Sequence, residues 1–309
     1  MLKGKDLISI HNLSIDEVHE ILDFAADLKV MQKRGLPHQF LKGKTLGMIF
    51  EKSSTRTRVS FEVGIFQLGG TGLFLSNKDL QLGRGEPIKD TARVLSRYLD
   101  GIMIRTYGHD RILELAKYSS VPVINGLSDL LHPCQVLTDL LTIREHKGKN
   151  FRSLKMAYVG DGNNMTNSYL YGAAKVGMNL TVATPANYKP NAEVFENALT
   201  DAEETKAELS WTENPVDAVK DADIIATDTW ASMGQEAEHD ERKKIFAPYQ
   251  VNAELLKHAS KNAIVLHCLP AYRGEEITEE VFENNAHVIF EEAENRLHTQ
   301  KAIMALTMA

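Results

Sequence analysis

The sequence predicts an α/β protein of two tandem domains, each with a mainly parallel β-sheet flanked by helices. Short apolar segments suited to buried strands alternate with segments whose apolar residues recur at helical spacing. The alternation stops at the polar stretch 145–150 and then begins again. Strands that are separated by helices pair in parallel, and helices then cover both faces of the sheet.

The polar stretch Glu145–Asn150 is the best candidate for a domain boundary in a chain of 309 residues, which is long enough for two cores. We assign residues 1–147 to the first domain and 148–291 to the second, and expect a C-terminal helix, 292–309, to pack back onto the first. Open parallel sheets bind ligands beyond the carboxyl ends of their strands. We therefore expect the active site in the cleft between the two domains.

Local signals fix several elements. Ser14 and Glu17 have the spacing of a capping box, and Pro133 suits the first turn of a long helix that ends by Gly148. Further helices are expected at 88–98, 111–118, 164–176 and from 291 onward. The expected strands are 45–50, 72–76, 101–105, 121–124, 154–159, 179–184, 208–211, 223–227 and 263–267, with a last one at 287–290.

The amino-acid composition indicates a globular protein and argues against several kinds of partner and location. A hydrophobic share of 43% and a charged share of 25% are typical of globular proteins. The net charge of -7, without a block of basic residues, argues against nucleic acid as the main partner. No apolar run approaches a membrane span, and the N-terminus lacks the apolar stretch of a signal peptide. The two cysteines cannot form a disulfide framework, which favours a cytoplasmic protein.

A candidate anion site lies where the strand 45–50 gives way to a helix, at Ser53–Arg58, which reads SSTRTR. The N–H groups of a first helical turn, the positive end of the helix dipole, hydroxyls and guanidinium groups all favour an anion there. An ordinary N-cap followed by a solvated basic turn is the alternative interpretation. The nucleotide-binding pattern GxxxxGK[ST] is absent from this segment.

Two further segments of the first domain bring polar groups to the same edge of the sheet. Arg105 ends a strand, and His132 and Gln135 stand at the start of the helix that follows the next strand. Taken singly, Arg105 fits a surface ion pair, His132 a structural role and Cys134 a packed position. Together these side chains suit a phosphate and a carbonyl group.

Four motifs then occur in one order. They are Ser54-Thr-Arg-Thr57, His132-Pro-Cys-Gln135, Asp228-Thr-Trp-Ala-Ser-Met-Gly234 and His267-Cys-Leu-Pro270. In this order they resemble the aspartate/ornithine carbamoyltransferase family over essentially the whole chain, and the last two resemble its ornithine branch. The resemblance implies transfer of the carbamoyl group of carbamoyl phosphate to the side-chain amine of ornithine, giving citrulline. It places the reaction in arginine metabolism and amino-acid biosynthesis, without a metal or cofactor.

The resemblance also implies a role for each matched residue. It implies a homotrimer whose active sites are shared, with Gln81 reaching across to a neighbour. Catalytic roles fall to Cys268, Arg105, His132 and Asp228. The residues implied for carbamoyl phosphate are Ser54, Thr55, Arg56, Thr57, Gln81, Arg105, His132, Gln135, Cys268, Leu269 and Arg296, and those implied for ornithine are Asn164, Asp228, Ser232 and Met233.

Other functions were weighed against this one. Aspartate as the acceptor would need cations for its two carboxylates, and the segment 228–236 has none. Putrescine stays open as an alternative cationic acceptor, although it lacks a carboxylate for Asn164 to bind. A nicotinamide-dependent oxidoreductase is disfavoured because Met165 stands where the fingerprint requires a small residue. A catalytically inactive homologue is a further alternative, and Cys268 itself fits either buried packing or activation of the amine.

Overall fold

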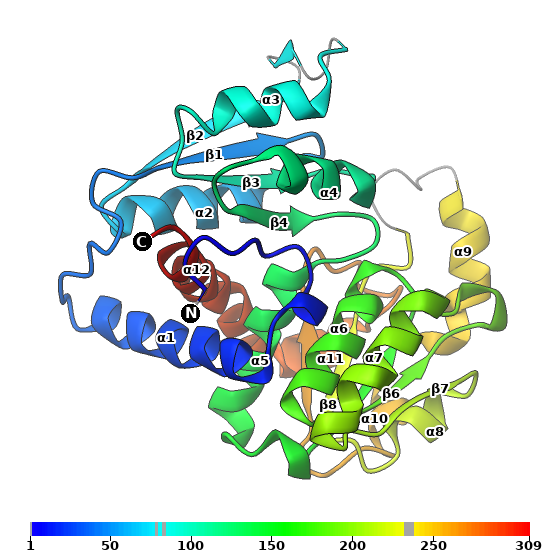
Figure 1. Ribbon diagram of the computed structural model, residues 1–309. Coiled ribbons are helices and arrows are strands. Elements are labelled where there is room, and N and C mark those ends of the chain that lie inside the picture. The colour runs from blue at the N-terminus through cyan, green and yellow to red at the C-terminus, as the bar shows by residue number, and fades with distance from the viewer. Residues whose placement is uncertain (1, 78–79, 82–84, 232–237) are drawn as a thin grey trace. The chain divides into compact units, whose positions relative to one another are not determined.

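The computed structural model describes residues 2–77, 80–81, 85–231 and 238–309 (Figure 1). Two compact units make up the chain. The first comprises the described residues up to Leu141 together with Asn295–Ala309, and the second comprises Thr142–Glu294. Each unit has a parallel sheet flanked by helices, so the predicted fold class is confirmed. The residue at which one domain ends and the next begins stays a prediction.

The first unit contains, within its described residues, a four-stranded parallel sheet in the order β2-β1-β3-β4. The ends of β1 and β3 are level, since Phe50 pairs with Arg105. Groups that follow these two strands therefore start from the same edge of the sheet. The strands are β1 (Thr45–Phe50), β2 (Thr71–Ser76), β3 (Gly101–Arg105) and β4 (Val123–Leu127).

Helices cover both faces of this sheet. On one face, α3 (Ile88–Leu95) and α4 (His109–Tyr118) pack against apolar residues of β1 and β3 such as Ile49. Figure 1 shows α2 (Thr55–Gln67) and the end of α12 (Ala286–Met308) on the side opposite α3. Tight glycine contacts bring these helices close: a Cβ at Gly101 would lie 2.9 Å from the Met308 sulfur.

The second unit contains, in the part that is described, a five-stranded parallel sheet in the order β7-β6-β5-β8-β9. An apolar cluster joins α8, α9 and α11 to one face, while α6 lies against α7 and contacts β6 from the other (Figure 1). All residues of α6 are buried, as expected for a helix enclosed between a sheet and another helix. The strands are β5 (Lys155–Val159), β6 (Asn179–Ala183), β7 (Leu209–Thr212), β8 (Ile224–Thr227) and β9 (Ile264–His267).

The capping box expected at Ser14 and the helix start expected at Pro133 are confirmed. Ser14 Oγ accepts from Glu17 N at 3.1 Å, and Glu17 Oε2 accepts from Ser14 N at 2.8 Å, which completes the capping box of α1 (Ile15–Lys33). No described helix is long and apolar enough to cross a membrane. The remaining helices are α5 (Pro133–Lys147), α6 (Asn164–Val176), α7 (Ala192–Thr205), α8 (Pro215–Val219), α9 (His239–Phe246), α10 (Ala253–Leu256) and α11 (Glu279–Asn284).

The strand expected at 287–290 is wrong. This segment forms the first turns of α12, which begins at Ala286 and continues without a break into the expected C-terminal helix. Val288 and Ile289 are buried whereas Phe290 is 57% exposed. The apolar run was too short to distinguish a strand from the buried face of a helix, and no Gly or Pro separates it from the helical pattern that follows.

Candidate active site

In both sheets, some of the predicted site residues follow the strands on either side of the point where the strand order changes direction. In the first unit β1 lies between β2 and β3, so the chain runs from β1 to β2 on one side and then returns to β3 on the other. In the second unit β5 lies between β6 and β8 in the same way. Crevices of this kind, outside the carboxyl ends of the strands, are where open α/β sheets bind ligands.

The predicted phosphate motif begins α2. Ser54 is the N-cap, and its Oγ accepts from Thr57 N at 3.2 Å. Thr57 is buried and Arg56 is half-buried, whereas the guanidinium of Arg58 stacks 3.7 Å from the centre of the Phe74 ring. Ser54 is therefore an N-cap, as the alternative interpretation predicted. The same helix terminus still has the features that an anion requires.

Arg296 joins two other predicted residues, Thr57 and Gln135. This residue of α12 donates through Nη2 to Thr57 Oγ1 at 2.9 Å and through Nη1 to Gln135 Oε1. Gln135 in turn donates through Nε2 to Asp139 Oδ1 at 2.8 Å. The first turns of α2 and α5 and the middle of α12 thus meet around one buried guanidinium.

His132 lies among buried cations. Burial holds its pKa well below the usual value, and the positive charges of Arg296, Arg105 and Lys52 lower that pKa further. The imidazole is therefore neutral at neutral pH. A neutral imidazole can donate a hydrogen bond to a carbonyl oxygen without adding another charge to the site.

Sequence reasoning missed Lys52. Its side chain is buried, with Nζ 3.3 Å from Asp129 Oδ1 and 4.9 Å from the centre of the Tyr107 ring. Its position directly before the Ser/Thr motif was the available signal, but an isolated lysine in a loop usually faces solvent. The preceding carboxylate of Glu51 fixes the same loop, because it accepts from Arg111 Nε at 2.9 Å.

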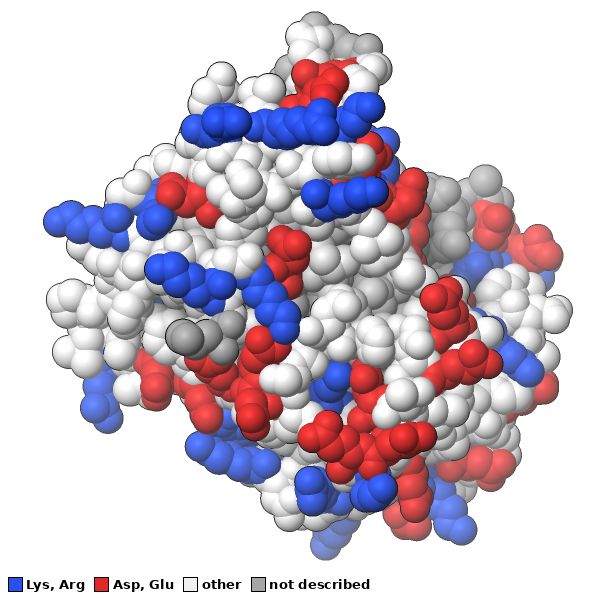
Figure 2. Space-filling model, viewed as in Figure 1, with Lys and Arg blue, Asp and Glu red and all other residues white. Residues whose placement is uncertain are grey.

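The cations of this site are buried rather than displayed on the surface. Lys52, Arg105 and Arg296 are 5%, 7% and 4% exposed. Figure 2 shows basic and acidic side chains interspersed on the face that it presents. A protein with a net charge of -7 can therefore still hold a local concentration of positive charge.

In the second unit, three predicted residues follow neighbouring strands. Asn164 begins α6 after β5, Asp228 follows β8, and Cys268 follows β9. Cys268 Sγ donates to Asp228 Oδ1 at 3.2 Å, so the structure brings these two together. Asp228 Oδ1 also accepts from Thr229 N at 2.8 Å.

The turn after β9 has a fixed conformation. Leu269 has a positive φ of 59°, and its N–H donates to His267 Nδ1 at 2.9 Å. His267 Nε2 lies 3.0 Å from Glu276 Oε1, and both side chains are buried. Since Nδ1 accepts, Nε2 carries the proton and donates to the carboxylate. This pair holds the backbone that carries Cys268.

A buried ion pair flanks Asp228 and was not foreseen. Arg242 of α9 donates through Nη2 to Asp161 Oδ2 and through Nε to the Trp230 carbonyl. Burial raises the pKa of Asp161 to about 6, against the opposing effect of the Arg242 guanidinium, and the Asp228 carboxylate raises it further. Asp161 and Arg242 are far apart in the sequence, so no local pattern links them.

The structure leaves three predicted site residues without a described contact to the other site residues, for two different reasons. Gln81 lies exposed between β2 and α3, with its carbonyl accepting from Glu86 N at 3.1 Å. Ser232 and Met233, expected to bind ornithine, lie outside the described residues, as does Gly234 at the end of their motif. Their roles stay predictions.

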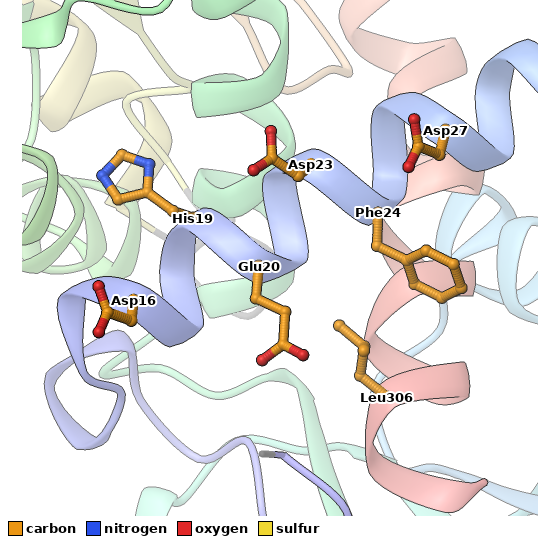
Figure 3. A pocket seen from close by; sticks show the side chains of 7 residues that line it. All are labelled: Asp16, His19, Glu20, Asp23, Phe24, Asp27 and Leu306. Atoms are coloured by element: carbon orange, nitrogen blue, oxygen red, sulfur yellow. The ribbon is translucent and has the colours of Figure 1, made fainter.

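A surface pocket of about 470 Å³ lies elsewhere in the first unit, beside α1 (Figure 3). Four carboxylates of α1 line it, so it would repel a phosphate, and it contains none of the predicted site residues. The lining residues are Asp16, His19, Glu20, Asp23, Phe24, Asp27 and Leu306. Within the described residues, no three His, Cys, Asp or Glu side chains gather closely enough to hold a metal ion.

Two parallel α/β units, one with a buried cationic site and one with a paired thiol and carboxylate, define a group-transfer enzyme that joins an anionic donor to an amine. Comparison with known proteins agrees. Residues 5–145 match a family model described as aspartate/ornithine carbamoyltransferase, carbamoyl-P binding domain, and residues 152–307 match the corresponding Asp/Orn binding domain. The chain belongs to the aspartate/ornithine carbamoyltransferase family.

Individual relatives are similar over nearly their full length. The ornithine carbamoyltransferase of Carboxydothermus hydrogenoformans is 58% identical, with 99% of this chain and 98% of the relative covered. That of Thermococcus kodakarensis is 56% identical, with 99% and 97% covered. The solved structure of ornithine carbamoyltransferase from Pyrococcus furiosus is 53% identical with a TM-score of 0.96, covering 99% of this chain and 98% of that one.

The environment of His132 predicts how stability depends on pH. Its pKa is lower in the folded protein than the reference value of about 6.5, so below that pH the unfolded chain binds the proton more readily. The stability that depends on neutral His132 is present above about pH 6.5 and is lost as the pH falls toward the lower, folded-state pKa. When the pH falls from about 7.5 to about 5.5, the free energy of unfolding should therefore decrease less for His132→Gln than for the parent.

Urea unfolding at both pH values measures this difference. His258→Gln, at an exposed position, is the matched control and should follow the parent. If His132→Gln loses as much stability as the parent, burial of a neutral imidazole makes no contribution to the pH dependence of stability.

Proposed function

We propose that this chain transfers the carbamoyl group of carbamoyl phosphate to the side-chain amine of L-ornithine, giving L-citrulline and phosphate. The observation that carries the proposal is the opposite electrostatic character of the two clusters. Buried Lys52, Arg105 and Arg296 surround His132 in the first unit, which suits a dianionic acyl phosphate. Asp228 with Cys268 in the second unit suits a cationic amine.

We assign the phosphate of carbamoyl phosphate to the N-terminus of α2. The helix dipole, the Thr57 hydroxyl and the guanidinium of Arg56 would share the negative charge. His132 would donate to the carbamoyl oxygen, where charge builds as the amine attacks. A positioned donor of this type contributes about 3–4 kcal/mol in other enzymes. The proposed contacts are Ser54, Thr55, Arg56, Thr57, Gln81, Arg105, His132, Gln135, Cys268, Leu269 and Arg296.

Activation of the amine falls to Cys268. An alkylammonium group titrates near 10.4, so only a small fraction of ornithine carries a neutral side-chain amine at neutral pH. The thiol donates a hydrogen bond to Asp228, and its sulfur lone pairs can accept a hydrogen bond from the neutral amine, which leaves its extra proton in solvent before it binds. The departing phosphate can take the amine proton itself, so the proposed reaction needs no metal and no cofactor.

The acceptor is assigned from charge. Asp228 would bind the α-ammonium of ornithine, and Asn164, with Ser232 and Met233, its carboxylate. Putrescine has no carboxylate, so it would leave these groups without a ligand. The relatives that share more than half of their residues with this chain are named for ornithine, which supports the same acceptor.

We further propose a cytoplasmic homotrimer with shared active sites. Val59, Val63 and Phe66 lie on one side of α2 and are 51%, 38% and 77% exposed. Leu73 and Phe74 on the neighbouring edge strand β2 are also exposed. An apolar face of this kind favours a protein partner. A second copy docked there would lie beside the start of α2 and the segment of Gln81.

A panel of amines tests the proposed reaction. The parent protein with carbamoyl phosphate should form citrulline from ornithine and much less product from putrescine or aspartate. Product is identified by mass spectrometry, and phosphate release is followed in parallel. Carbamoylation of putrescine at the rate of ornithine would make the alternative acceptor correct, and phosphate release without any carbamoylated amine would contradict both.

Two substitutions test the roles in the second unit. Cys268→Ser keeps the size and hydrogen bonding of the side chain but replaces a thiol by a far weaker acid. We expect kcat to fall about tenfold or more and the pH profile to move, with the KM for carbamoyl phosphate nearly unchanged. Asp228→Asn should instead raise the KM for ornithine about tenfold or more.

Cys134→Ser is the matched control for the thiol. Cys134 is buried, donates to the Asn125 carbonyl at 3.3 Å, and has a pKa raised to about 12 by burial. A serine there can make the same hydrogen bond, so activity should persist. If Cys268→Ser also kept its rate and pH profile, the thiol would be a packing residue.

Phe66→Asp tests the oligomer. Sedimentation equilibrium of the parent should give three times the chain mass of 34.5 kDa, and the variant should dissociate because a charge in an apolar interface is costly. Leu199→Asp, at an exposed position on α7 of the second unit, is the control and should remain associated. A monomeric parent would contradict the proposal.

A further inference from the structure

Asn163 makes two kinds of hydrogen bond from one side chain. It is the N-cap of α6, and its Oδ1 accepts from Met165 N at 2.9 Å and Thr166 N at 3.3 Å. Its Nδ2 donates to Asp228 Oδ2 at 3.0 Å. The residue therefore connects the start of a buried helix to the carboxylate proposed to bind ornithine.

The orientation of the Asn163 amide is determined by its neighbours. Two backbone N–H groups and the Tyr158 hydroxyl, at 3.4 Å, all require the oxygen on their side. The carboxylate requires the NH₂ group on the other side. Burial raises the pKa of Tyr158 well above its usual value, and the charge of Asp228 raises it further, so this hydroxyl stays a donor.

Asp228 is held through both oxygens. Oδ2 accepts from Asn163, while Oδ1 accepts from Thr229 N and from the Cys268 thiol. The carboxylate is only 7% exposed, so water can replace little of this bonding. Burying polar oxygens is costly unless hydrogen bonds satisfy them. The bond from Asn163 comes from a neutral amide side chain, which can donate without adding a charge beside Asp228.

We propose that Asn163 is a positioning residue that fixes the orientation of the Asp228 carboxylate, and through it the affinity for ornithine. The inference rests on the proposed function of Asp228. Asparagine and aspartate are equally good N-caps, so capping alone does not require asparagine here. A carboxylate at position 163 would instead face Asp228 at about 3 Å, where two like charges cannot both stay ionised.

Two variants separate capping from positioning. Asn163→Ser and Asn163→Asp both keep an N-cap oxygen but lose the amide donor. Asn252→Asp is the matched control: Asn252 caps α10 by accepting from Leu255 N at 3.0 Å, away from Asp228. The other titratable groups that face Asp228 are Tyr158, Asp161 with its partner Arg242, and Cys268, and the variants leave all of them in place.

Steady-state kinetics with each substrate varied give the result. We expect both Asn163 variants to raise the KM for ornithine about tenfold or more, with the KM for carbamoyl phosphate within about twofold of the parent. In Asn163→Asp, the acidic limb of kcat/KM for ornithine should move up by about one pH unit. Thermal unfolding should stay close to that of the parent for all three variants.

The inference is overturned if both Asn163 variants match the parent in KM and pH profile, because Asn163 is then only a cap. An equal rise in both KM values, together with a lower unfolding temperature, would also overturn it by showing general damage. A parent that forms no citrulline would contradict the proposed function instead. Once the parent forms citrulline, the KM values bear on Asn163 alone.

Discussion

The cationic site of the first unit depends on the hydrogen bonds of one buried side chain, Arg296. It joins α12 to Thr57 of α2 and Gln135 of α5, both of which begin at the carboxyl edge of the first sheet. Burying a guanidinium costs several kcal/mol unless its hydrogen bonds are satisfied. The contacts to Thr57 and Gln135 offset part of that cost, and an incoming phosphate would offset more. Part of the desolvation cost of these buried cations therefore remains uncompensated, and a bound dianion would offset it.

The second unit solves the opposite problem. The Asp228 carboxylate is largely removed from water and lies next to a thiol and near a second carboxylate, Asp161. Asn163, the Thr229 N–H and the Cys268 thiol supply donors to Asp228, while Arg242 compensates Asp161. Both units thus use the same topological position, the change of direction in a parallel sheet, for opposite charges. Loop composition, rather than fold, decides which charge each site attracts.

Much of this arrangement was predictable because its determinants are local. The strands β1 and β3 and the helix α6 have the predicted bounds, since periodicity and caps lie within each segment. The site motifs were found because each follows directly from a strand end. Lys52, Asn163 and the Asp161–Arg242 pair were missed because their meaning depends on partners distant in the sequence. The resemblance assigned Asn164 to ornithine, but it gave no role to the neighbouring Asn163, whose partners are seen only in the structure.

The chain path through the two units has a consequence for the order of synthesis. The first unit needs Asn295–Ala309 as well as the residues up to Leu141, and the whole second unit is encoded between these two parts. Nascent chains fold from the N-terminal side as they emerge from the ribosome. When the ribosome has translated all of the second unit, the first unit still lacks the C-terminal part of α12 and therefore lacks Arg296. The cationic cluster of the first unit is thus completed only after the whole second unit has been translated and has had time to fold.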